Sequence, residues 1–361
     1  MATLGEHLEG KALRNNAFDT IRLLAAASVI ISHAFSLVDG YEINEPLFVA
    51  SNGQITIGRS AVAAFFVVSG LLISLSFDRS PSWHRFVTNR ALRLFPALWV
   101  CLLLTVFVFG AAATTVPLSE FLGSRETWGF MGNAVFLQLN PSLPGVFDGH
   151  PESDSFNSSL WTLKYEVACY VIGAIMLSFG KLRLQLVAIA WFGAMIATPI
   201  IGNPIGQHGF MYYLAWLVWL FRFYGAGMLL YLLRDRIPVA KGPALVSLAL
   251  VLLATFTPVY TEALAMFGAY ALIAAAFLAS GWFKRLTHRG DLSYGVYIYA
   301  FPVQQFFVPF SNETAVPWLT NVALSLPVTF FLAWLSWHFV ERPALSLKTV
   351  IGARKTAARS G

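Results

Sequence analysis

Residues 18–38 read FDTIRLLAAASVIISHAFSLV, an apolar run as long as a membrane-spanning helix that nevertheless contains Arg22 and His33. Eleven residues separate the two, close to three whole helical turns, so both side chains project from one face, about 16.5 Å apart along the axis. A cation inside the bilayer costs about 2.5–3.5 kcal/mol on insertion scales, and such a residue usually marks a functional site. The alternative is that Arg22 extends to the headgroups and His33 is a packing residue.

The composition indicates a polytopic membrane protein. Of the 361 residues, 57% are hydrophobic and 12% are charged, whereas soluble domains carry about 25% charged residues. Cys101 and Cys169 both lie in apolar runs, so we expect neither a disulfide framework nor a metal site. The first apolar run is too long for a cleaved signal peptide, and we expect it to be retained.

Ten apolar runs are long enough to cross about 30 Å of hydrocarbon. They cover residues 18–38, 57–77, 94–113, 160–179, 182–202, 210–232, 238–257, 260–280, 292–311 and 317–340. Lys and Arg gather in alternate connecting segments, which places both termini in the cytoplasm by the positive-inside rule. We therefore expect an all-α, polytopic membrane helix bundle of about ten transmembrane helices in the cell (inner or plasma) membrane. The net charge of +6 then reflects topology, not nucleic-acid binding.

Residues 1–343 form the predicted transmembrane domain, and residues 344–361 form a short basic cytoplasmic tail. The longest segment between apolar runs, residues 114–159, faces outward in this topology and is rich in Pro, Gly and Ser. Loops of this length usually have a role or are disordered.

Glu166 is predicted to lie at a depth similar to that of His33, because the fourth run starts at the outer surface and His33 lies in the outer third of the first. A carboxylate beside an imidazole holds its tautomer, as a general base requires. The alternative is an ion pair of Glu166 with Lys164 or Arg59 at the outer rim.

Arg90 and Arg93 lie three residues apart at the cytoplasmic start of the third run, and Pro96 is expected in the first turns of that helix. A helix start with two guanidinium groups could bind phosphates. The alternative is that these arginines bind no ligand and only follow the positive-inside rule, and their spacing alone favours this alternative. Arg222 falls near the middle of the sixth run and should face the protein interior and find a partner there.

Six motifs recur in a familiar order and spacing. They are Arg-x10-His at 22–33, Phe-Phe-x-x-Ser-Gly-Leu-Leu-Ile at 65–73, Asn-Arg-x-x-Arg-x-x-Pro at 89–96, Ser-Leu-Trp-x-Leu-x-x-Glu at 159–166, Ser-Tyr-x-x-Tyr at 293–297 and Glu-Arg-Pro at 341–343. Together they resemble the acyltransferase family 3 membrane proteins over nearly the whole chain.

The resemblance implies an integral membrane O-acyltransferase, most often an acetyltransferase that uses cytoplasmic acetyl-CoA. The expected partners are acyl-CoA, a glycan or glycolipid acceptor such as lipopolysaccharide or another polysaccharide, and membrane lipids. The Arg-x10-His pair is then essential, and Arg90 and Arg93 serve the donor. Ser69 and Tyr297 are further candidates for donor binding, with helix packing and an aromatic belt as their alternatives.

Two features depart from the family pattern. Ala300 occupies the position at which relatives often carry a histidine, and we do not expect the C-terminal esterase-like domain that some relatives carry.

The mechanism expected from these residues places the donor phosphates near Arg90 and Arg93, with the acyl arm extending toward His33. His33, oriented by Glu166, would deprotonate the acceptor hydroxyl, or would briefly accept the acyl group itself and pass it on. The competing hypothesis is a glycolipid or polysaccharide transporter without acyl-transfer activity. We find no repeated halves and no matched pair of broken helices, which are typical of many transporters.

Overall fold

The computed structural model describes residues 2–40, 42–80, 82–136, 142–152, 155–287 and 290–348, and most of the predicted tail, residues 349–361, lies outside them. Within these residues the regular structure is helical, and no strand is formed. The all-α fold class is therefore confirmed. In hydrocarbon each backbone polar group must be paired within its own segment, and a helix achieves this.

The chain divides into two units. The first comprises Met1–Ser28, Ile43–Pro81 and Thr162–Arg289, and the second comprises Val29–Glu42, Ser82–Trp161 and Gly290–Gly361. Helix α3 (Phe18–Asp39) continues from the first unit into the second.

The helices of the first unit are α1 (Leu4–His7), α2 (Gly10–Arg14), α4 (Pro46–Ala50), α5 (Ile57–Arg79), α11 (Leu163–Leu177), η4 (Gly180–Leu182), α12 (Arg183–Ile201), η5 (Pro204–Gly206), α13 (Gly209–Leu232), α14 (Lys241–Ala254), α15 (Tyr260–Ala263), η6 (Leu264–Gly268), α16 (Ala269–Leu278) and α17 (Gly281–Arg285). Those of the second unit are α6 (Trp83–Leu104), η2 (Thr105–Gly110), α7 (Ala111–Ala113), α8 (Leu118–Gly123), α9 (Arg125–Met131), α10 (Asn133–Phe136), α18 (Ser293–Asn312), α19 (Pro317–Ser336) and η7 (Trp337–Glu341). The short η1 (Glu42–Asn44) and η3 (Ser158–Thr162) lie at the boundaries between the units.

Eight helical stretches of the described chain are long and apolar enough to cross a membrane, against the ten expected. They are Gly10–Asp39, Ile57–Arg79, Trp83–Ala113, Ser158–Leu177, Gly180–Ile201, Gly209–Leu232, Tyr260–Leu278 and Pro317–Lys348. The other two expected spans do form helices. However, α14 has 14 residues, about 21 Å at 1.5 Å per residue, and α18, with 20 residues, is not among the eight.

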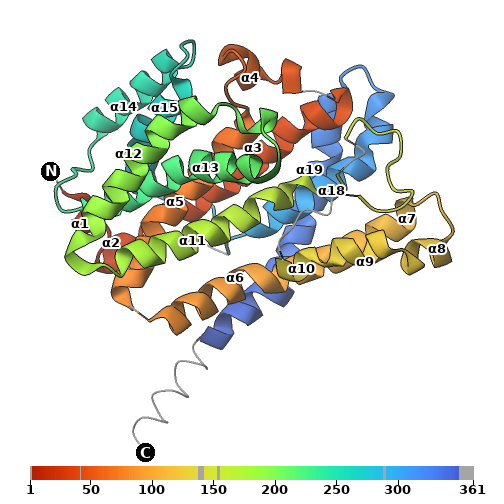
Figure 1. Ribbon diagram of the computed structural model, residues 1–361, viewed down its shortest axis with the longest axis horizontal. Coiled ribbons are helices and arrows are strands. Elements are labelled where there is room, and N and C mark those ends of the chain that lie inside the picture. The colour runs from red at the N-terminus through yellow and green to blue at the C-terminus, as the bar shows by residue number, and fades with distance from the viewer. Residues whose placement is uncertain are drawn as a thin grey trace, which may run out of the picture. The chain divides into compact units, whose positions relative to one another are not determined.

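Helices α5, α11, α12 and α13 pack against one another in the first unit (Figure 1). At the contact of α5 with α13 the backbones approach closely. A Cβ atom on Gly70 would lie 2.0 Å from the carbonyl oxygen of Tyr224, and one on Gly227 would lie 2.1 Å from that of Val67. Small residues allow such close approach of helices in membranes.

Buried polar side chains join α18 to its neighbours in the second unit. The Tyr294 hydroxyl donates to the carbonyl oxygen of Leu94 on α6 at 2.9 Å. The Asn321 side chain on α19 donates to the carbonyl oxygen of Gln304 at 3.0 Å. Helix α18, with Pro302 and Pro309 inside it, is thereby tied to both α6 and α19.

One boundary expectation is wrong. Helix α6 begins at Trp83, with Ser82 as its N-cap, and not near residue 94. Pro96 therefore lies inside the helix and not in its first turns. The segment 83–93 is rich in His, Arg and Asn, so its hydropathy conceals that it continues the same helix.

Candidate active site

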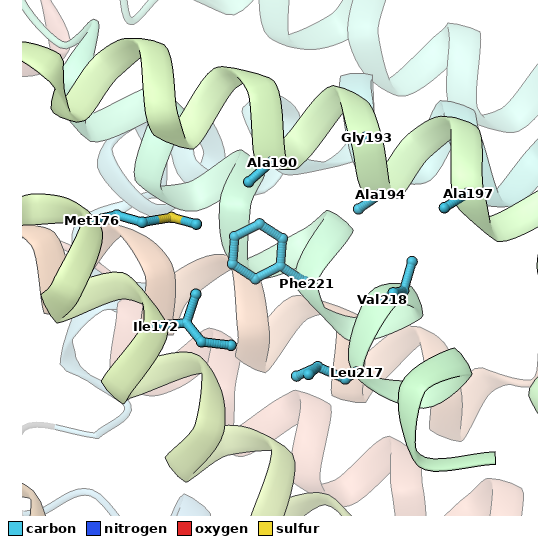
Figure 2. A pocket seen from close by; sticks show the side chains of 9 residues that line it. All are labelled: Ile172, Met176, Ala190, Gly193, Ala194, Ala197, Leu217, Val218 and Phe221. Carbon is cyan, nitrogen blue, oxygen red and sulfur yellow. The ribbon is translucent and has the colours of Figure 1, made fainter. Parts of the chain in front are cut away.

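The described residues of the first unit line at least two apolar pockets, and neither of these contains a predicted site residue. Figure 2 shows the smaller one, about 230 Å³, where Phe221 of α13 and Met176 of α11 point toward the small residues of α12. The larger, about 720 Å³, lies along α14 and α16 and has Lys241 among its lining residues. The walls of the smaller pocket offer space but no group for acid–base or nucleophilic chemistry.

Arg22 and His33 lie on one unbroken helix, as their spacing predicts. Helix α3 runs from Phe18 to Asp39, and both residues are partly buried. The Arg22 guanidinium lies over the ring of Phe65, 5.9 Å from its centroid. Phe65 opens the motif at 65–73, so these two predicted motifs meet within the first unit. A cation over an aromatic face is stabilised by the quadrupole of the ring.

The His33 ring packs edge-on against Phe301 of α18, with 5.1 Å between the ring centroids. Its Nδ1 atom is buried and has no hydrogen-bond partner among the described residues. Residue 33 as a whole is partly exposed. The two ring nitrogens of a neutral imidazole differ, since one donates and the other accepts, so the surroundings of Nδ1 decide which role Nε2 takes.

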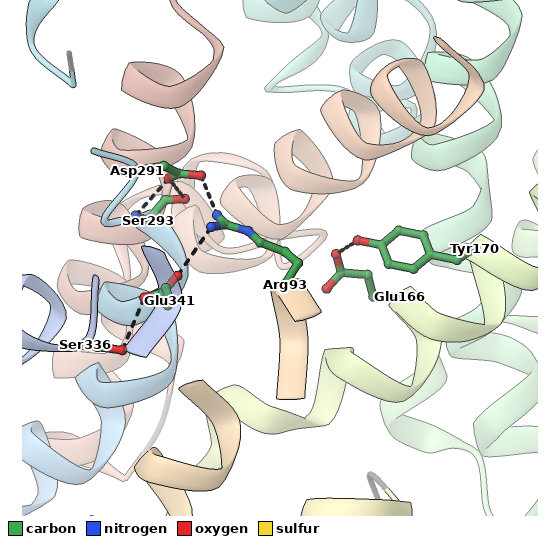
Figure 3. A network of polar contacts seen from close by, with 7 residues as sticks. All are labelled: Arg93, Glu166, Tyr170, Asp291, Ser293, Ser336 and Glu341. Atoms are coloured by element: carbon green, nitrogen blue, oxygen red, sulfur yellow. Dashed lines mark hydrogen bonds and ion pairs between the residues drawn. The ribbon is translucent and has the colours of Figure 1, made fainter. Parts of the chain in front are cut away.

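Glu166 lies in the first turn of α11, where its carboxylate accepts a hydrogen bond from the Tyr170 hydroxyl one turn further along (Figure 3). Lys164, one of the two partners named in the alternative interpretation, lies over two aromatic rings. Its Nζ is 4.5 Å from the ring centroid of Tyr213 and 5.3 Å from that of Tyr165.

Three of the predicted motifs meet at Arg93 in the second unit (Figure 3). The guanidinium donates to Asp291, which precedes the Ser-Tyr motif, and to Glu341 of the Glu-Arg-Pro motif at 3.3 Å. Asp291 also accepts from the backbone N–H of Ser293 at 3.1 Å, and Glu341 accepts from the Ser336 hydroxyl at 3.2 Å. Glu341 ends the π-helical turn η7 and is 2% exposed. Arg93 thus holds the start of α18 and the end of η7 to α6.

The helix-start argument for Arg90 and Arg93 is wrong, because both lie well inside α6 and not at its N-terminus. A third cation nevertheless lies near their guanidinium groups. Lys348, at the end of the described chain, lies within electrostatic reach of both arginines. Three neighbouring cations, one of them held by two carboxylates, still form a positive region that could take a phosphate.

Ser69 and Tyr297 lie on α5 and α18 respectively. Ser69 is partly exposed. Tyr297 is 7% exposed, and the neighbouring Tyr294 and Tyr299 are buried as well, at 8% and 2%. The aromatic-belt interpretation of these tyrosines is therefore wrong, because belt residues face the lipid headgroups.

Arg222 is confirmed as an interior residue with a partner. It is 0% exposed, and its Nη1 lies 3.0 Å from Oε1 of Glu262 on α15. The rings of Trp219 and Phe223 flank the guanidinium, with centroids 5.7 and 5.6 Å from Cζ. Ion pairing and aromatic contact offset part of its desolvation, while Nε and Nη2 have no hydrogen-bond partner among the described residues.

No motif or spacing in the sequence had indicated a role for Asp291, Gln304, Asn321, Lys348 or Glu262. Two signals could have found some of them. Asp291 stands two residues before a motif, and Gln304 is a polar residue within an apolar run, as Arg222 is. Glu262 lies at the start of its apolar run, where hydropathy alone does not distinguish a buried acidic residue from one in the preceding loop.

Comparison with known proteins agrees with this architecture. A family model described as an acyltransferase domain matches residues 15–338. An O-acetyl transferase of Shigella phage Sf6 is 30% identical over 92% of this chain and 97% of its own length. Nodulation protein 10 of Rhizobium leguminosarum bv. viciae is 28% identical over 98% of this chain and 99% of its own length. The putative peptidoglycan O-acetyltransferase YrhL of Bacillus subtilis (strain 168) is 26% identical over 90% of this chain, which spans 54% of that protein. No solved structure matches the chain.

The helical architecture and the family match define a multi-pass membrane protein with acyltransferase activity. More particularly, the chain belongs to acyltransferase family 3, and the match covers all of the described segments in which the predicted site residues lie. The transporter hypothesis receives no support from these comparisons.

Proposed function

We propose that this protein transfers an acyl group, acetyl in the simplest case, from cytoplasmic acyl-CoA to a hydroxyl group of a cell-surface or secreted glycan. The observation that carries the proposal is His33, an imidazole within a membrane helix whose Nδ1 is buried while the residue as a whole is partly exposed. Support also comes from two relatives, named an O-acetyl transferase and a putative peptidoglycan O-acetyltransferase.

In the proposed reaction, His33 takes the proton of the acceptor hydroxyl through Nε2. The hydroxyl oxygen then attacks the thioester carbonyl, the C–S bond breaks, and the imidazolium returns its proton to the leaving thiolate of CoA. Glu166 is the proposed carboxylate partner of this step. The acceptor reaches His33 from the outer side, where the segment 114–159 would hold the glycan.

The donor binds at the cytoplasmic side in this proposal. Its phosphates lie at Arg90 and Arg93, and Lys348 adds a third positive charge. Arg22, about 16.5 Å along α3 from His33, meets the extended arm of the donor. Ser69 and Tyr297 are proposed to line its path. The orientation follows from the positive-inside rule, with both termini in the cytoplasm and the protein in the cell (inner or plasma) membrane.

The test uses purified protein in lipid nanodiscs, radiolabelled acetyl-CoA and membranes of the producing organism as the source of acceptor. We expect His33→Ala to reduce incorporation of label into the glycan fraction about 10²- to 10⁴-fold, because a general base contributes that much. His208→Ala is the matched control, since His208 is exposed just before α13 and has no proposed role. Transfer by His33→Ala at nearly the wild-type rate would refute the assignment.

A further inference from the structure

Gln304 lies beside the predicted catalytic helix, although no predicted motif includes it. It belongs to α18 and is 0% exposed. Its side-chain Nε2 donates to the carbonyl oxygen of Ile30 on α3 at 2.8 Å and to Oδ1 of Asn321 at 3.0 Å. Because both contacts are to acceptors, the amide orientation is defined, and Oε1 must point elsewhere.

The Oε1 atom of Gln304 is buried and has no partner among the described residues. A buried acceptor without a hydrogen bond is costly, and native proteins rarely leave one unsatisfied. Asn321, which is also 0% exposed, is occupied by the Nε2 and backbone carbonyl of Gln304. In the two side-chain amides, the other three polar atoms each make a hydrogen bond, and Oε1 of Gln304 makes none among the described residues.

His33 is one turn beyond Ile30 on α3. A helical side chain leans toward the N-terminus of its helix, so the His33 ring covers the turn that carries the Ile30 carbonyl. Phe301, which packs edge-on against that ring, is one turn before Gln304 on α18. The Gln304 amide and the His33 ring thus occupy adjacent turns of the same two helices.

Two unpartnered buried atoms of complementary kind therefore lie in one small region, Nδ1 of His33 and Oε1 of Gln304. The first donates when the neutral ring carries its proton on Nδ1, and the second can only accept. No direct hydrogen bond joins them, and polar atoms beyond that distance are commonly joined by one water molecule.

We propose that Gln304 is a positioning residue for His33: it accepts the Nδ1–H hydrogen bond through one bridging water. This contact keeps the ring in the tautomer whose Nε2 is unprotonated, the form that can take a proton from a hydroxyl. The inference rests on the proposed function, because it assigns the role of a neighbour to the proposed base.

Three variants test the proposal in the acetyl-CoA assay. We expect Gln304→Leu to lower kcat about 10- to 100-fold, the loss expected for one buried hydrogen bond, with KM for acetyl-CoA within about twofold of wild type. Gln304→Glu keeps an acceptor oxygen of the same reach, and we expect it to restore kcat to within about threefold. Asn321→Ala removes the tie between α18 and α19 but not Oε1, and we expect reduced thermal stability with kcat nearly unchanged.

The outcomes separate this proposal from the proposed function. If His33→Ala is inactive and Gln304→Leu keeps the wild-type kcat, Gln304 has no positioning role while His33 remains the base. If folded Gln304→Glu is as inactive as Gln304→Leu, the donor bond to Ile30 is what matters and the proposal is wrong. If Gln304→Leu does not fold, the Glu variant and Asn321→Ala decide the question by the same criteria. If His33→Ala is active, both the proposed role of His33 as the base and the positioning role of Gln304 are wrong.

Discussion

Arg222 carries its charge at 0% exposure in α13, whereas its partner Glu262 is 29% exposed at the side chain. Because of this difference in exposure, removing the carboxylate and removing the guanidinium should change the stability of the protein by different amounts. A buried cation without its carboxylate has no access to water, whereas the carboxylate without the cation keeps some hydration.

We therefore expect Glu262→Ala to destabilise the protein by about 3–5 kcal/mol, the usual cost of leaving a buried charge unpaired. Arg222→Leu should cost less, and the double variant should resemble Arg222→Leu and not the sum of the two. Unfolding of the purified protein in detergent, followed through all three variants as a double-mutant cycle, measures the coupling. Equal losses for the two single variants, with additive effects in the double, would show that the pair does not matter.

Arg93 illustrates how one residue can serve both structure and binding. Its two carboxylate partners come from positions 198 and 248 residues further along the chain. Charge-assisted hydrogen bonds of this kind are about twice as strong as neutral ones. The proposed phosphate contact is accordingly made by a guanidinium that is already fixed in place.

At the scale of elements, the contact of α5 with α13 depends on reciprocal glycines. The missing side chains of Gly70 and Gly227 let each helix meet a backbone carbonyl of the other. Where lipid tails are as apolar as the helices, such close packing is a main source of association.

We expect Gly70→Ala to destabilise the protein by about 1–3 kcal/mol, because an added Cβ would overlap the backbone of α13 and force the helices apart. Gly193→Ala on α12 is the matched control. A Cβ atom at Gly193 meets nothing within 4 Å, so the higher helix propensity of Ala should leave stability unchanged or slightly increased. Thermal unfolding of both variants provides the measurement. Equal melting temperatures would contradict the close-packing account.

At the scale of the whole molecule, the number of membrane crossings decides which loops face outward. Ten crossings with a cytoplasmic N-terminus place residue 256 outside and residue 282 in the cytoplasm. Eight crossings, without α14 and α18, reverse both positions. Lys284 and Arg285 favour the first arrangement by the positive-inside rule.

We expect a cysteine in place of Phe256 to react with a membrane-impermeant maleimide on intact cells, and a cysteine in place of Trp282 to react only after lysis. Both positions are 73% exposed, and the native Cys101 and Cys169 are buried, so background labelling should be low. The reverse labelling pattern would establish eight crossings.

Much of the architecture was predictable because hydrocarbon imposes a local rule. Long apolar runs must form helices, so α3, α5, α13 and the others follow from hydropathy, and the spacing of Arg22 and His33 already places them on one helix. The rule depends on polarity and therefore misplaced the start of α6, whose polar first turns lie at Trp83.

The order of the motifs along the chain likewise identified the family, but not which motifs meet. Arg93 finds Asp291 and Glu341, and the amide of Gln304 finds Ile30 and Asn321, through packing of helices distant in the chain. The free energy of transfer into the membrane is approximately a sum over the residues of a segment, so the sequence alone predicts which segments insert as helices. Which side chain ends beside which depends on helix crossings and rotamers that arise only when the whole bundle is assembled.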